Sequence, residues 1–121
     1  MIRLTGEINI FPQAHKSEAG NFNTFQTSIE NDDPNNPGSK VRAYFEVRFS
    51  KEQFPKERLD AMGEGFYYTI ELIDAWLMVR AYKAKDGTEG KAVYIYVKDG
   101  KPTKKTPLKA KRLKEDNELP F

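Results

Sequence analysis

Residues 66–83 read FYYTIELIDAWLMVRAYK and form the longest candidate strand of the chain. Apolar and polar side chains alternate along it in steps of two, which indicates a β-strand and not a helix. Fully extended, it would span about 60 Å at roughly 3.3 Å per residue, which is too long for a flat sheet in a small domain. The strand must therefore bend, and Asp74, which interrupts the apolar pattern, is predicted to form a β-bulge.

Four further strands are predicted around this one, separated by turn-forming stretches rich in Asp, Asn, Pro and Gly. Their ranges are 2–10, 22–30, 40–49 and 91–98. A short helix is predicted at 55–62, because Pro55 suits a first helical turn and Gly63 can end it. Five strands with a helix between the third and fourth are the order of the OB-fold, a partly open Greek-key barrel. The predicted fold class is therefore all-β with one short helix.

The charges are divided unevenly along the chain, although its net charge is only +2. Residues 98–114 hold 8 Lys/Arg against 1 Asp/Glu, whereas residues 115–121 hold 3 acids and no base. We predict one domain at 1–99, followed at 100–121 by a flexible basic arm and an acidic C-terminal tail. The basic stretch fits either an arm that follows a polyanion or a solvated linker.

Several classes of site are not expected from the composition. Cysteine is absent, which removes disulfides and thiolate chemistry and is compatible with a cytoplasmic location. The longest apolar stretch, 75–79, is too short to cross a membrane. His15 is the single histidine and lies in a polar stretch, so no metal or cofactor is expected. No phosphate-binding loop or nucleophile motif is present, and we do not expect an enzyme.

Alternation also predicts which strand face could bind a nucleic acid. Residues 73, 75, 77, 79 and 81 share an apolar face that is interpreted as core, whereas Trp76, Arg80 and Tyr82 share the other. Flat rings that stack on bases and cations that meet phosphates are what single-strand binding requires. The residues predicted to contact nucleic acid in this way are Arg42, Tyr44, Arg48, Trp76, Arg80, Tyr82, Lys83, Tyr94 and Tyr96. The alternatives for this face are a subunit interface or a second half of the core.

The last residues, 115–121, read EDNELPF, an acidic run without an apolar period that ends in an aromatic ring. Such a segment usually stays solvated, so the terminal ring is interpreted as a docking group that inserts into a pocket of a partner protein. This ending resembles the tail of bacterial and phage single-stranded DNA-binding proteins. Further similarity lies in Phe49-Ser50-Lys51, where the family has an aromatic residue, Gly and Lys before its helix, and in residues 82–87, YKAKDG.

The resemblance to a phage-type single-stranded DNA-binding protein implies sequence-independent binding and protection of DNA during replication, recombination and repair. It also implies a homodimer or homotetramer, and contact of DNA by Phe49, although alternation places Phe49 on the core side of its strand. Recruitment of replication and recombination proteins would use the tail residues Asp116, Glu118, Leu119, Pro120 and Phe121. An RNA-binding OB module and a protein adaptor that uses the aromatic face remain alternatives.

Overall fold

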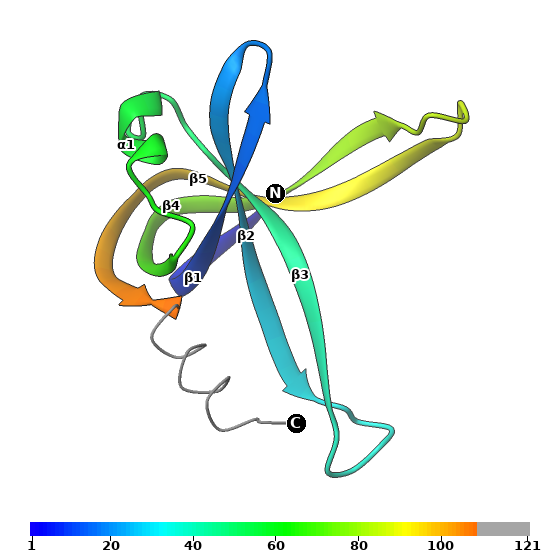
Figure 1. The fold of residues 1–121 in the computed structure, drawn as a ribbon. Helices are drawn as coiled ribbons and strands as arrows, with labels where there is room; N and C mark the ends of the chain where they lie inside the picture. The colour runs from blue at the N-terminus through cyan, green and yellow to red at the C-terminus, as the bar shows by residue number, and fades with distance from the viewer. Residues whose placement is uncertain (109–121) are drawn as a thin grey trace, which may run out of the picture.

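The computed structural model describes residues 1–108, which form five strands and one short helix (Figure 1). The elements are β1 (Ile2–Ser17), β2 (Gly20–Asp32), β3 (Lys40–Phe49), α1 (Lys56–Asp60), β4 (Phe66–Lys83) and β5 (Glu89–Pro107). The strands close into a barrel in the order β1-β2-β3-β5-β4, and β3 and β5 are its parallel pair. The predicted all-β OB-fold with a helix between the third and fourth strands is confirmed. No helix within residues 1–108 has the length and apolar character needed to span a membrane.

β4 bends where the sequence predicts it. Its pairing with β5 shifts register on both sides of Asp74, and β1 shifts opposite it between Leu4 and Gly6. Gly6 has φ of 94°, a conformation that side chains disfavour, so glycine permits the shift in β1. Before the bulge in sequence, the buried residues of β4 have even numbers, Tyr68, Ile70 and Leu72. After it, the odd-numbered Ala75 is buried. The bulge therefore exchanges the two faces of the strand.

The predicted core face of β4 is wrong at three of its five positions. Ile73 is 56% exposed because it lies at the bulge, and Val79 is 64% exposed. Ala81 is also exposed. Beyond Leu77, β4 no longer pairs with β1. From Val79 onward β5 also no longer pairs with β3, and β4 and β5 continue as a two-stranded arm, which projects to the right in Figure 1. Residues of this arm therefore have no barrel interior to face.

β1, β2 and β5 are longer than predicted. β1 and β2 continue together to a turn at Ser17 and Gly20, forming the hairpin at the top of Figure 1. A flexible arm is predicted from residue 100, but residues 100–107 continue β5 and pair with β4 as far as Phe66↔Pro107. Lysine-rich sequence can join a sheet because its long stems cover apolar surface, as Lys105 does by placing Nζ 4.1 Å from the centre of the Phe66 ring.

The core fills the barrel and is closed at one end by Phe54. Phe54 is fully buried, and its ring lies 4.7 Å from that of Phe49. Ser50 holds the loop that carries Phe54, since its Oγ donates to the Lys98 carbonyl (2.7 Å) and its own carbonyl accepts from the Phe54 amide. The serine that stands where the resembling family has glycine thus ties β3 to β5.

Replacing Phe54 with alanine should destabilise the fold by about 3–5 kcal/mol, because it removes a fully buried ring and leaves a cavity. Urea unfolding measures this loss. Phe22→Ala is the matched control, since Phe22 is 43% exposed on the β1–β2 hairpin and should cost much less. Equal losses for the two variants would contradict the role of Phe54 as the plug of the barrel.

Candidate nucleic-acid interface

A row of flat side chains crosses the outer wall of the barrel on four neighbouring strands. Trp76 on β4 is in register with Arg3 on β1 and with Tyr96 on β5, and Tyr96 is in register with Arg48 on β3. The rings of Trp76 and Tyr96 are nearly parallel, at 13°, with centres 6.3 Å apart. The Arg3 guanidinium carbon lies 5.8 Å from the centre of the Trp76 ring. This row therefore holds two neighbouring rings with a cation at each end, and both rings are half-buried.

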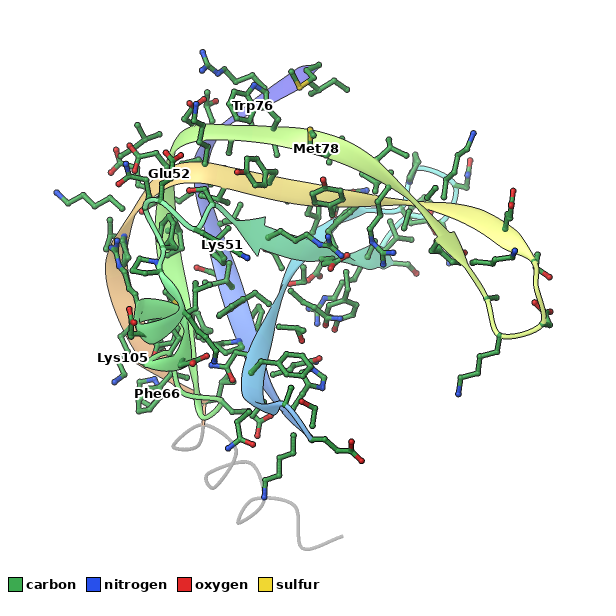
Figure 2. The ribbon with its side chains drawn as sticks, turned by 90° about the horizontal axis from the view of Figure 1, so that it is seen from above. Lys51, Glu52, Phe66, Trp76, Met78 and Lys105 are labelled. Carbon is green, nitrogen blue, oxygen red and sulfur yellow. The ribbon has the colours of Figure 1, made fainter. Side chains whose placement is uncertain are left out.

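A second row lies one step further toward the arm. Met78, Tyr94 and Glu46 are in register there, and Figure 2 shows Met78 beyond Trp76 along β4. The Arg48 guanidinium carbon lies 5.1 Å from the Tyr94 ring centre. Two cations meet at Glu46, since Arg48 Nε donates to its Oε2 (2.8 Å) and Arg80 Nε to its Oε1 (3.0 Å).

The carboxyl of Glu46 titrates below its usual range. Partial burial raises the pKa of Glu46, but the hydrogen bonds and charges of Arg48 and Arg80 together outweigh this effect. The pKa is therefore lower than the ordinary value of 4.5. Glu46 is ionised at neutral pH, and the centre of this face carries one anion between two cations.

The β4–β5 arm extends the same face. Arg80 lies over the Tyr82 ring, with 5.7 Å from its guanidinium carbon to the ring centre. Tyr82 lies flat across Gly90, where an added Cβ would come within 2.5 Å of the ring. The surface of the arm has an open pocket of about 700 Å³. It is lined by Ala81, Tyr82, Lys83, Glu89, Gly90 and Lys91. Within residues 1–108, neither Lys83 nor Lys91 forms an ion pair.

Arg42 and Tyr44 share the outward face of β3 but lie on its other half. β3 pairs with β5 only from Glu46 to Phe49, so the two residues extend away from Tyr94 along the β2–β3 hairpin. Tyr44 is 61% exposed. Arg42 donates to Glu30 at 2.6 Å, and this hydrogen bond and charge raise the pKa of Arg42 and lower that of Glu30.

Phe49 packs toward the core, as alternation indicates. Its ring meets Phe25 nearly at right angles, with centres 5.1 Å apart, and also contacts Phe54. The DNA-contacting position that the resemblance implies is therefore not an outward ring. The remaining exposed part of Phe49 lines a groove of about 330 Å³ between β2 and β3, together with Thr24 and Arg48.

The sequence does not predict two side-chain contacts, one on this surface and one on the β1–β2 hairpin. Arg3 was not singled out, because its position over Trp76 depends on the register between β1 and β4. The polar stretch around His15 belongs to β1, where the His15 ring stacks on Phe22 at 5.1 Å and hydrogen-bonds to Thr24 Oγ1 at 2.7 Å. Both depend on cross-strand pairing, for which a single sequence carries no direct signal.

The remaining predictions concern metal ligands and the C-terminal tail. In the part of the chain that the structure describes, no group of three or more His, Asp or Glu side chains is placed to hold a metal ion. The tail residues Asp116, Glu118, Leu119, Pro120 and Phe121 lie outside the described residues.

Comparison with known proteins gives a structural similarity but no family. The sequence matches no protein-family model and no curated protein. Among solved structures, the chain is similar to the Plasmodium falciparum SSB in its complex with ssDNA. The TM-score is 0.48 and the sequence identity 13%, over 85% of this chain and 93% of that one.

Glu46→Gln should reduce stability at neutral pH, and the reduction should disappear in acid. A pKa that is lower in the folded state means that ionised Glu46 stabilises the fold above the unfolded pKa near 4.5. This contribution is lost as the pH falls through the lower folded pKa. Urea unfolding of both proteins at neutral pH and at successively lower pH measures the change. A difference in stability that stays constant with pH would show that Glu46 acts by packing and not by charge.

Proposed function

We propose that this protein binds single-stranded DNA without sequence preference, on the outer face of β3, β5 and β4. The observation that carries the proposal is the row Arg3, Trp76, Tyr96 and Arg48, which presents rings beside guanidinium groups on one curved wall. Stacking on such rings is worth about 1–3 kcal/mol per base and tolerates any base, because every base has a π-face. Phosphates would meet Arg48, Arg80, Arg42 and Lys83.

Several features favour unpaired bases as the ligand of this face. Stacking requires bases that are free of their partner strand. The helix α1 has 5 residues and lies against β2, where Asn23 donates to the Leu59 carbonyl, so it is too short and too closely held to read a major groove. Rings distinguish DNA from RNA poorly, and the preference for DNA that we propose rests on the sequence of the tail.

The wider role that we propose is to coat and protect DNA strands during phage replication and recombination, in the cytoplasm of the host. Partner proteins would dock on Leu119, Pro120 and Phe121, and the chain would form a homodimer or homotetramer. Exposed apolar residues on the β4–β5 arm support an assembly, since Val79 is 64% exposed and its cross-strand partner Val93 is 42% exposed.

The experiment that tests DNA binding uses Trp76, the single tryptophan of the chain. Titration with a deoxythymidine homopolymer should quench its fluorescence, and the logarithm of the binding constant should fall linearly with the logarithm of salt concentration. Poly(U) and duplex DNA are the comparison ligands. Binding of neither single-stranded polymer at any salt concentration would reject the proposal in favour of a protein adaptor.

Trp76→Ala should weaken binding of labelled oligo(dT) by about 1–3 kcal/mol, measured by fluorescence anisotropy. The fold should remain, because Trp76 lies on the outer wall and not in the core. Tyr67→Ala is the matched control: its ring contacts Phe11 on another part of the barrel surface and should leave the affinity unchanged. Equal affinity losses in the two variants would place the binding face elsewhere.

Deleting residues 115–121 should leave the affinity for DNA unchanged or raised, because three acids that compete with DNA for basic groups are removed. Loss of co-purification with replication or recombination proteins, at intact DNA affinity, is the expected result. A large loss of DNA affinity in the truncated protein would instead assign these residues to the binding of DNA.

A further inference from the structure

Glu46 occupies an unexpected place for an acid, at the centre of a face that we propose binds a polyanion. Its two carboxyl oxygens accept hydrogen bonds from different arginines, Arg48 on its own strand and Arg80 from β4. β5 runs between those strands, so the Arg80 side chain reaches across it to Glu46. The three side chains remain in contact with solvent, at 31% exposure for Glu46, 37% for Arg80 and 50% for Arg48.

The arrangement matches what a DNA phosphate would form with the same two arginines. A phosphate also offers two oxygens to guanidinium groups, and charge-assisted hydrogen bonds of this kind are short and strong. The arginines are placed beside the rings on which bases would stack, Arg48 over Tyr94 and Arg80 over Tyr82. A strand on these rings would bring its backbone close to the position of the Glu46 carboxylate.

We propose that Glu46 is an internal competitor for the DNA backbone, which holds Arg48 and Arg80 in the free protein and is displaced by a phosphate when a strand binds. The inference rests on the function proposed above and concerns how the same face is regulated. Holding the arginines beside the rings lowers the entropy lost on binding, while the carboxylate repels the approaching phosphate. The repulsion keeps affinity below the value that the cations alone would give.

Arg3 and Arg42 also pair with acids, but each with an acid that holds only one arginine. Arg3 donates to Asp74 at 2.7 Å and Arg42 to Glu30 at 2.6 Å, each acid holding one arginine. Glu46 differs from both because it pairs with two. It is therefore the single acid whose removal would free two cations at once within the described residues.

A purely structural role makes the opposite prediction. If Glu46 only ties the β4–β5 arm to β3, its removal would loosen Arg80 and the arm, and affinity for DNA would fall or stay constant. If Glu46 competes with phosphate, the same change would raise affinity even though it lowers stability. The sign of the change in affinity separates the two roles.

The test compares Glu46→Gln with Glu52→Gln in binding to oligo(dT). Both variants remove one negative charge, but Glu52 is exposed in the loop after β3 and forms no ion pair within residues 1–108. We expect Glu46→Gln to bind about 3- to 10-fold tighter at low salt and Glu52→Gln to change by less than about 2-fold. The gain should shrink as salt screens the charges.

A double-mutant cycle shows whether the gain acts through the two arginines. In an Arg48→Ala/Arg80→Ala background, adding Glu46→Gln should produce no more gain than Glu52→Gln produces. An undiminished gain in this background would mean that Glu46 acts through its general field, and would overturn the proposal.

A measurement on the unaltered chain covers the case in which Glu46→Gln does not fold. The Nε–H NMR signals of Arg48 and Arg80 should shift during titration with oligo(dT), saturating together with the quenching of Trp76. Arg58, which lies over Phe54 at 4.7 Å, is the internal control and should not shift. If wild-type protein binds no DNA, the proposed function fails. If it binds DNA while Arg48 and Arg80 do not shift, or Glu46→Gln binds no tighter than Glu52→Gln, only the present inference fails.

Discussion

The barrel can close only because β4 bends at Asp74. β4 pairs with β1 on one side and β5 on the other, and it must curve for the barrel to close. The bulge also decides which rings face outward: without the exchange of faces, Trp76 would continue the inward series of Tyr68 and Ile70. The ion pair of Asp74 with Arg3 crosses from β4 to β1 at this point. The same bulge therefore closes the barrel and exposes the aromatic row.

The parts of the fold that could be predicted are those where alternation of side chains and turn-forming residues clearly mark a strand. β3 and β4 have the predicted bounds, because alternation, flanking turns and Pro55 all mark their ends. The predicted end of β5 is wrong because the nine residues beyond it, 99–107, are all polar or turn-forming, and their order comes from pairing with β4. Val79 is exposed for a related reason, since alternation shows that a face is apolar but not whether a barrel lies beneath it.

The sequence predicts on which strand face each residue of the candidate site lies, but not which side chains it contacts on neighbouring strands. Alternate residues of a strand face opposite sides, and this alternation correctly places Trp76, Tyr96 and Arg48 on the same side of β4, β5 and β3. It says nothing of register, which brings Arg3 onto Trp76. The pairing of the outer arginines with acids is hidden for the same reason. Where resemblance and alternation disagree, at Phe49, the packing against Phe25 follows alternation.

The contact between Tyr82 and Gly90 has a consequence for how the chain can vary over evolution. The ring occupies the space in which any other residue at position 90 would place its Cβ. A larger residue there would lift the phenol off β5 and tilt it away from Arg80. Positions 82 and 90 should therefore co-vary among related chains, with an aromatic residue at one accompanied by the lack of a side chain at the other.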